Sequence, residues 1–525
     1  MARRIWCSLA VGLVACNDPS PAPNDAGATP DVQPSSVSVR FDLAADLTQP
    51  AHFYDLPWPS DLRLTAAGTP DLRGFRYSAR GAGLLRGILE IAQQRPRFPV
   101  LPVAYFRFTG PVTPQEDTRV IPATGDASLL LVDIDPMSPE RGRRFPLVAA
   151  TLTEDDYAPS DTLAVAARPG FLLRGNRKYA FVVLRSLRSA RGEPLTPNPV
   201  FEQIKRGEAP SGAQGAAAVA LYQPLWETLR AARVNVDDVA AATVFTTADT
   251  VADTAALGDR VVERFDATIE NLRLAPGDTV ATHPRYCQLV GTMNAPQFQQ
   301  GSPPFNTDGL FRLDAQGVPT PVTYADRPDY GRIPVTVTLP RARMPAGGFP
   351  LVVYFHGSGG VSNAVVDRGL WRVRSNDFPC AQGTDTYEGR TGCNTLGEGP
   401  AHVLAARGFA TAGSALPVNP ERLPGAGETA YLNFANLKAF RDTFRQGVLE
   451  QRLYIEALSR LRIPANLVAQ CAGVELPTGV TEASFDTSRL VAMGQSMGGM
   501  YTNLLAATEP RIKAAIPTGA GGFWG

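Results

Sequence analysis

The residues best suited to chemistry in this 525-residue sequence are a serine and the glycines that flank it. Gly494-Gln495-Ser496-Met497-Gly498 matches the pattern G-x-S-x-G. Because the chain holds 48 glycines, chance produces such a match in roughly one of four chains of this composition. Here, however, a buried strand is expected before it and a helix after it, and a sharp turn between the two would expose the serine Oγ. We expect Ser496 to be a nucleophile, with Gly494 and Gly498 relieving backbone collisions; the alternative is a plain Gly/Ser turn.

A second glycine-rich motif, His356-Gly357-Ser358-Gly359-Gly360, directly follows the apolar run 350–355. A loop in this position can supply a backbone N–H to a developing oxyanion, beside the N–H of the residue after the nucleophile. We therefore expect Met497 N–H and Ser358 N–H to be the oxyanion donors. His356 and Gly357 are expected to support the loop, with His356 as a brace and not a base. The alternative is a flexible glycine loop.

The elements that must position these motifs follow an alternating pattern in residues 279–525. Strands are expected at 335–339, 350–355, 409–416, 490–493 and 514–516. Helices are expected at 401–407, 433–461 and 497–507. Strands separated by helices of this length indicate a doubly wound α/β sheet. The near-continuous apolar run 350–355 is typical of a strand buried on both faces.

Residues 37–270 have a different pattern and predict a β-rich N-terminal domain with added helices. Short β-branched or aromatic runs, bounded by Gly, Pro or Asp, predict strands at 103–108, 129–133, 145–152, 179–187 and 244–247. Helical spacing of apolar residues predicts helices at 214–232 and 254–265, the first kinked or interrupted by Pro224.

From about residue 333 to 525 the chain resembles the α/β-hydrolase superfamily, on the two glycine motifs in their order along the chain. It is further similar to bacterial extracytoplasmic lipases and esterases with a lipoprotein signal. That similarity uses the strings Leu56-Pro57-Trp58-Pro59-Ser60-Asp61-Leu62 and Met344-Pro345-Ala346-Gly347-Gly348, with Arg441-Asp442 and Arg445-Gln446. The resemblance implies an α/β-hydrolase doubly wound sheet after a β-rich accessory domain, and an esterase or lipase that forms an acyl-enzyme.

One departure from the superfamily concerns the rest of the catalytic triad. The superfamily places an acid and then a histidine after the serine. The residues after Ser496 include one acid, Glu509, just before a proline, and no histidine. His283, His356 and His402 all precede Ser496. The sequence thus predicts a hydrolase domain that is C-terminally incomplete, lacks the triad acid and histidine, and is inactive as it stands.

The expected substrate is a small-molecule or lipid ester. Lys and Arg total 50, as do Asp and Glu, so the neutral chain suits an uncharged ester and lacks the basic excess of a nucleic-acid binder. No cofactor is implied, and no metal site is expected because the chain has no CxxC pair and its four histidines are dispersed. The alternatives are a peptidase or polyester depolymerase on the same fold, or a non-catalytic surface scaffold.

The N-terminus predicts export. Arg3 and Arg4 precede the apolar run 5–15, which ends in small residues before Cys16. This is typical of a signal peptide, here residues 1–16 with a lipobox whose Cys16 becomes acylated; an ordinary cleaved signal is the alternative. Residues 17–36 are rich in Pro, Asn, Asp and Ser and predict a flexible tether. We expect an exported lipoprotein, anchored to a membrane on its periplasmic or cell-surface face.

Four further cysteines, Cys287, Cys380, Cys393 and Cys471, are candidates for disulfides in an oxidising compartment. Three pairings are possible, and Cys380 with Cys393 is favoured because the two are close in sequence. Both lie in the segment 361–400, which is long for a strand-to-helix connection. This segment is expected to wall or cover the acyl pocket, with Trp371 and Phe378 as lining; a surface excursion pinned by a disulfide is the alternative.

Overall fold

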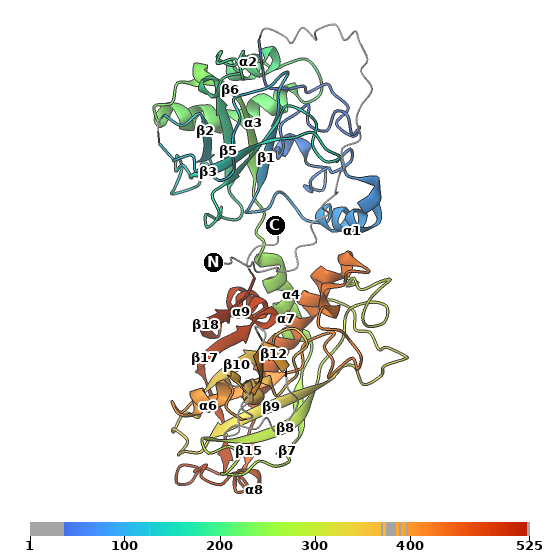
Figure 1. The fold of residues 1–525 in the computed structure, drawn as a ribbon, viewed down its shortest axis with the longest axis vertical. Coiled ribbons are helices and arrows are strands. Elements are labelled where there is room, and N and C mark those ends of the chain that lie inside the picture. Colours follow the sequence, from blue (N-terminus) through green and yellow to red (C-terminus); the bar gives the residue numbers. More distant parts are fainter. Residues whose placement is uncertain are drawn as a thin grey trace.

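A computed structural model describes residues 36–124, 126–368, 371–373, 385–387, 390–394 and 397–521 (Figure 1). The described chain forms two bodies stacked along the long axis of the molecule, the blue-to-green part in one and the yellow-to-red part in the other (Figure 1). None of its helices is long and apolar enough to cross a bilayer. Some predictions lie outside the described residues: the leader and the tether up to residue 35, Cys16, Phe378, Cys380, and the side chains of Trp371 and Cys393.

The N-terminal body contains two three-stranded antiparallel sheets, with the orders β1-β4-β3 and β2-β5-β6. Their strands are β1 (Val103–Arg107), β2 (Leu129–Asp133), β3 (Leu147–Leu152), β4 (Thr162–Ala167), β5 (Lys178–Leu184) and β6 (Val239–Thr246). The strands expected from the sequence correspond to β1, β2, β3, β5 and the second half of β6, whereas β4 was not foreseen.

The β2-β5-β6 sheet is buried on both faces. Leu131 and Phe181 pack with Phe106 of the other sheet, while Leu130 and Val182 face the opposite way, toward the helices. The helices of this body are α1 (Ala82–Ala92), α2 (Pro199–Lys205) and α3 (Gly215–Ala231). Burial on both faces explains the continuous apolar runs of β2 and β6. Of the kink or interruption expected at Pro224, the interruption is wrong, since α3 runs through this residue.

The C-terminal body is built on a seven-stranded sheet of order β18-β17-β10-β14-β9-β8-β7. β14, β10, β17 and β18 are parallel to one another, whereas β9 runs antiparallel to β14 and β8, and β7 antiparallel to β8. The strands are β7 (Thr268–Leu274), β8 (Tyr286–Asn294), β9 (Arg332–Pro340), β10 (Phe349–Phe355), β14 (Ala410–Ser414), β17 (Phe485–Gln495) and β18 (Ile512–Thr518). An α/β sheet, as expected, therefore carries the two glycine motifs.

Helices cover both faces of this sheet. One apolar core joins it to α4 (Ala252–Arg264), α7 (Leu437–Arg460) and α9 (Met497–Thr508). A smaller cluster on the other face contains Tyr286 and Tyr354 with side chains of α5 (Ala364–Asp367) and α6 (Pro400–Ala405). Val353 belongs to the first core and Tyr354 to the second cluster. Adjacent residues of β10 thus face opposite sides, which accounts for its wholly apolar sequence.

The boundary between the two bodies lies earlier in the sequence than the expected boundary at 270–279. Leu257 and Val261 of α4 are buried in the core of the C-terminal body, and β7 pairs with β8 as the edge strand of its sheet. The sequence does not mark this boundary because β7 is mostly exposed and lacks an apolar run. Residues from about 252 onward therefore belong to the C-terminal body.

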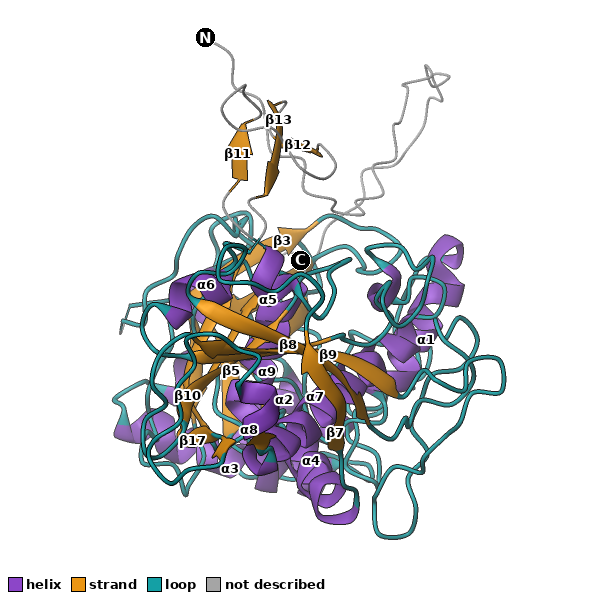
Figure 2. Cartoon of the chain, turned by 90° about the horizontal axis from the view of Figure 1, so that it is seen from below, coloured by secondary structure: helices purple, strands orange, loops and turns teal. Residues whose placement is uncertain are grey.

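A disulfide joins Cys287 of β8 to Cys471, 184 residues later. Cys471 follows the short elements β15 (Ile463–Pro464) and α8 (Ala465–Val468), and β15 pairs with β16 (Glu482–Ala483). Three further strands, β11 (Trp371–Val373), β12 (Asp385–Tyr387) and β13 (Arg390–Asn394), form a separate antiparallel sheet that stands away from the main body (Figure 2). Of the three pairings that the sequence allowed, the Cys287–Cys471 bond agrees with the one that joins Cys380 to Cys393.

Candidate active site

Ser496 occupies the turn between β17 and α9, with backbone angles φ 55° and ψ −121°. Few residues other than glycine adopt a positive φ, and such strain persists only where the surroundings impose it. Here the Ser496 N–H donates to the Thr518 carbonyl of β18 at 2.9 Å, and the Ser496 carbonyl accepts from Met500 N–H at 3.2 Å. The side chain is half-buried and makes no capping bond to its own helix. The Ser496 hydroxyl therefore lies at the carboxyl end of β17 and does not cap α9.

The two flanking glycines are required by the space around the turn. A Cβ on Gly494 would lie 2.2 Å from the Gly498 carbonyl oxygen. A Cβ on Gly498 would lie 1.9 Å from the carbonyl oxygen of Phe355, the last residue of β10. Both contacts are with backbone, which cannot move aside as a flexible side chain would. The spacing of the motif thus follows from the packing of α9 against β10.

The predicted oxyanion loop lies directly beside this turn. β10 and β17 are neighbours in the sheet, and Phe355 is in register with Gly494. A Cβ on Gly357 would come within 3.4 Å of the Ser496 Cβ and 2.6 Å of the Gln495 Oε1. Two motifs about 140 residues apart in sequence are therefore brought together because their strands pair.

Two backbone N–H groups near Ser496 are free to act as donors. Met497 is the first residue of α9, so its N–H has no acceptor within the helix. In the described residues neither Met497 N–H nor Ser358 N–H donates to a protein acceptor. The start of a helix also favours negative charge. The arrangement suits an anion that forms next to the Ser496 hydroxyl.

His356 fastens the oxyanion loop and is occupied at both ring nitrogens. Its Nε2 accepts from Leu416 N–H at 3.0 Å, which leaves Nδ1–H to donate to the Gly357 carbonyl at 2.8 Å. The ring is 1% exposed, and burial lowers its pKa from 6.5 to about 4. This neutral imidazole, hydrogen-bonded at both ring nitrogens, links the loop to the segment that follows β14.

A second link to the loop was not foreseen from the sequence. The Ser358 hydroxyl donates to the Tyr431 hydroxyl at 3.1 Å. Tyr431 packs edge-to-face on Phe444 of α7, and that ring stacks on Tyr501 of α9, with centroids 4.9 Å apart. The loop is thus connected through three rings to α9, the helix that directly follows Ser496. Nothing near Tyr431 in the sequence marks it, because the contact is made only in the folded chain.

The other three histidines lie in other parts of the fold. His52 Nδ1 lies 2.7 Å from Asp55 Oδ2 in the N-terminal body. His283 Nδ1 lies 2.6 Å from Asp278 Oδ1, and His402 is on α6, on the far face of the sheet from α9. In the described part of the chain no histidine lies within hydrogen-bonding distance of Ser496. The general base that a serine nucleophile needs is not among these four side chains.

Glu509 also has a structural role. It follows α9, is 2% exposed, and accepts two side-chain hydrogen bonds from Arg511 as well as one from Arg452. Burial by itself would raise the pKa of Glu509, but the bonds from Arg511 hold that pKa below its ordinary value. Among the described side chains no group of three His, Cys, Asp or Glu residues is arranged to hold a metal ion.

The buried imidazole of His356 predicts an acid-sensitive fold. An unfolded histidine takes up a proton near pH 6.5, whereas the folded His356 does so only near its pKa of about 4. The resulting stability, about 3 kcal/mol, is complete above pH 6.5 and is lost as the pH falls toward 4. We expect urea denaturation to show this loss, and the His356→Gln variant to show much less of it. A parental slope in His356→Gln would refute this assignment.

Comparisons with known proteins give partial structural similarity. No family model and no curated protein match the sequence. Among solved structures, the chain is similar to an acetyl xylan esterase from Paenibacillus sp. R4, with 16% identity over 51% of this chain and 59% of that one and a TM-score of 0.25. It is also similar to a glucuronoyl esterase from Solibacter usitatus, with 12% identity, 49% and 55% coverage, and a TM-score of 0.21.

A puromycin-hydrolyzing peptidase from Mycobacterium tuberculosis is similar over 43% of this chain and 28% of its own length, with 16% identity and a TM-score of 0.18. This chain spans less than two thirds of the length of each of these enzymes. The matched structures are thus esterases and a peptidase, each similar to this chain over part of its length.

Proposed function

We propose that this protein is a serine hydrolase of the α/β-hydrolase type that acts on carboxylic esters through an acyl-enzyme. The observation that supports this most is the position of Ser496, at a positive φ between two glycines whose Cβ atoms would strike backbone. Beside it lie two uncommitted N–H groups, those of Met497 and Ser358. A hydroxyl fixed next to such donors fits the attack of an alkoxide on a carbonyl carbon.

The chemistry follows from this arrangement. The Ser496 Oγ bonds to the ester carbonyl carbon as a base removes its proton, and the carbonyl oxygen takes up negative charge beside the two N–H groups. The bond from that carbon to the leaving alcohol oxygen then breaks, and the alcohol receives a proton. Water repeats the attack and releases the acid. Esters are favoured over amides because an amine leaves only when a positioned general acid protonates it, and no histidine in the described residues approaches Ser496.

Labelling by a fluorophosphonate probe tests this proposal, since the probe bonds to an activated serine oxygen. We expect the full-length protein to be labelled, and labelling and hydrolysis of p-nitrophenyl acetate to be lost in its Ser496→Ala variant. Ser488→Ala is the matched control, because Ser488 lies on the same strand, is exposed, and should be dispensable. Ester hydrolysis that persists in Ser496→Ala would contradict the assignment. Comparison of p-nitrophenyl esters with p-nitroanilides separates an esterase from a peptidase.

A non-catalytic binding role is the second candidate. It is favoured by the positions of the histidines, because a serine without a base is a poor nucleophile. In that case the probe would leave the protein unlabelled while the fold stayed intact.

We further propose that the chain works outside the cytoplasm, attached to a membrane through an acylated Cys16. The Cys287–Cys471 disulfide supports export, since such bonds persist mainly in oxidising compartments. The basic and apolar leader before Cys16 supports the anchor.

A further inference from the structure

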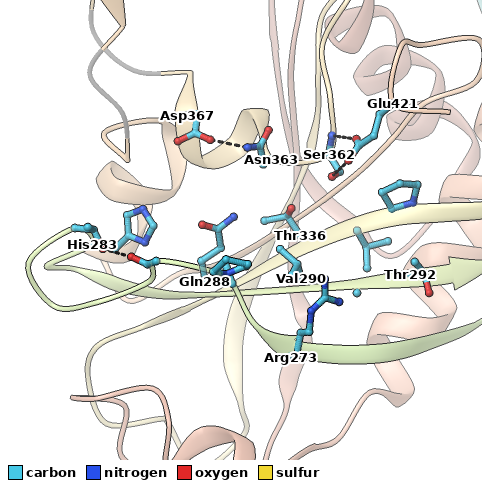
Figure 3. Close-up of a pocket in the computed structure, with 17 residues that line it drawn as sticks. Arg273, His283, Gln288, Val290, Thr292, Thr336, Ser362, Asn363, Asp367 and Glu421 are labelled. Carbon is cyan, nitrogen blue, oxygen red and sulfur yellow. Dashed lines mark hydrogen bonds between the residues drawn. The ribbon is translucent and has the colours of Figure 1, made fainter. Parts of the chain in front are cut away.

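A cavity of about 840 Å³ lies on the face of the C-terminal sheet opposite α7 and α9. Strands β7, β8 and β9 form its floor, and α5 with the loops around it forms its roof (Figure 3). β9 is three positions from β17 in the sheet order, which is about 14 Å at the usual strand spacing. Ser496 does not line this cavity, so its contents need an explanation separate from the proposed hydrolysis.

The floor strands have two chemically different faces. Residues at odd-numbered positions are buried in the apolar core: Cys287, Leu289, Met293, Ile333, Val335, Val337 and Leu339. On the opposite face, three even-numbered polar residues, Gln288, Thr292 and Thr336, line the cavity. Successive residues of a strand point to opposite faces. A buried sheet face normally packs against apolar side chains, whereas this one presents amide and hydroxyl groups beside Val290 and Pro334 to an open space.

The Thr336 hydroxyl is the most informative group on this face. Thr336 is 0% exposed, and its Oγ1 has no hydrogen-bond partner among the described residues. Two residues along the same strand and on the same face, the Thr338 hydroxyl is paired with that of Thr411 at 2.7 Å. Buried polar groups in folded proteins are nearly always bonded. In Figure 3, Thr336 points toward the roof of the cavity, so a molecule held there is the natural partner.

The roof supplies a complementary set of groups. Ser362 donates to Glu421 twice, from its hydroxyl at 2.9 Å and its N–H at 2.6 Å. Asn363 Nδ2 donates to Asp367 Oδ2 at 2.6 Å. These bonds fix both carboxylates and leave them further lone pairs to accept from hydroxyl donors. Floor and roof together present hydroxyl, amide and carboxylate groups across one space.

We propose that this cavity binds a neutral carbohydrate. The described lining contains no Phe, Tyr, Trp, Leu, Ile or Met, and its apolar surface comes from smaller residues such as Ala275, Pro276 and Val290, interspersed with the polar groups. An anion is disfavoured because Asp367 and Glu421 line the space, whereas Arg273, the one arginine of the described lining, is exposed. His283 is held by Asp278, whose other oxygen accepts from Arg341 at 2.8 Å. A ligand rich in uncharged hydroxyls, each both donor and acceptor, matches what remains.

The test is titration calorimetry of the full chain with xylotriose, cellotriose and mannotriose. We expect at least one to bind at a single site, and Thr336→Val to weaken that binding by about tenfold or more, since it removes one buried partner without changing shape. Thr338→Val is the matched control, because its hydroxyl is already paired and does not line the cavity. Asn363→Ala, on the roof, should weaken the same sugar. Fluorophosphonate labelling of Ser496 should be unchanged in every variant, so this test is independent of the proposed hydrolysis.

Three results would overturn the carbohydrate site. One is the absence of saturable binding for all three sugars. Another is binding that Thr336→Val and Asn363→Ala leave unchanged, which would place the sugar elsewhere. The third is tighter binding of trigalacturonate than of any neutral sugar, which would make the ligand an anion. Thermal melting of Thr336→Val at or above the parent temperature would show that a loss of binding is not a loss of fold.

Discussion

Replacing Gly498 by alanine is expected to abolish labelling of Ser496 and to lower the free energy of unfolding by about 3 kcal/mol or more. The added Cβ would sit 1.9 Å from the Phe355 carbonyl oxygen, 2.5 Å from its carbon and 2.7 Å from the His356 carbonyl oxygen. All three atoms are backbone at the end of a strand inside the sheet. Either α9 must move away from β10 or the loop that begins at His356 must move, and both changes separate Ser496 from the N–H donors.

Gly347→Ala is the control for this substitution. Gly347 lies in the turn before the same strand, β10, and a Cβ there meets nothing within 4 Å. Its replacement should change stability by no more than about 0.5 kcal/mol and leave labelling intact. Chemical denaturation of both variants measures the change in the free energy of unfolding, and probe labelling measures the reactivity of Ser496. If Gly498→Ala were labelled as rapidly as the parent, the tight contact between α9 and β10 would be wrong.

The second large effect is expected at a buried ion pair. Arg422 donates to Glu450 at 2.7 and 3.0 Å, and both side chains are at most 1% exposed. Glu450 also accepts from Gln297 and Gln446. Glu450→Ala would leave the guanidinium charged, buried and without its carboxylate. We expect the free energy of unfolding to fall by about 3–5 kcal/mol, measured by urea denaturation.

Two comparison variants sharpen this result. Glu227→Ala removes the partner of Arg141 at an exposed surface pair and should change stability by less than about 1 kcal/mol. Replacing both buried partners, as Arg422→Met with Glu450→Leu, should recover much of the loss, because no unpaired charge remains. A double variant as unstable as Glu450→Ala would show that the other bonds of the network, and not the unpaired charge, set the effect.

This ion pair also bears on the candidate site. Arg422 lies in the segment that follows β14, and the same segment provides the Leu416 N–H bonded to His356. The Arg422 guanidinium also donates to the Ala415 carbonyl at 3.5 Å and lies 4.4 Å from the centre of the Tyr330 ring. The buried pair thus fixes the chain to which His356, and through it the oxyanion loop, is attached.

The sequence predicted those parts of the site whose requirements are local. A glycine pair around Ser496, an apolar run before it and a helix after it all reflect collisions and burial within a few residues. The strand 350–355 was equally clear, because burial on both faces leaves no polar positions to confuse the pattern. These two signals sufficed to expect that the serine and the loop of His356 act together; the pairing of β10 with β17 is a finding of the structure.

The features that could not be predicted from the sequence depend on contacts between distant residues. β8 was missed because Gln288 and Thr292 interrupt its apolar pattern, and they do so because they face a cavity. The Cys287–Cys471 pairing is set by the packing of β8 against the segment after α8, not by sequence spacing. Tyr431 reaches Ser358 only after α7 has docked. Each of these contacts spans more than 70 residues, beyond the reach of any local pattern.

The two-sided character of β8 and β9 has an evolutionary consequence. Neighbouring residues along each strand are constrained by different factors. The odd-numbered residues are constrained by packing in the core, and the even-numbered ones by what occupies the cavity. Substitutions at the even positions can therefore alter selectivity while the odd positions keep the scaffold stable. Such a division lets recognition diversify among descendants of this chain without eroding the architecture that presents the serine.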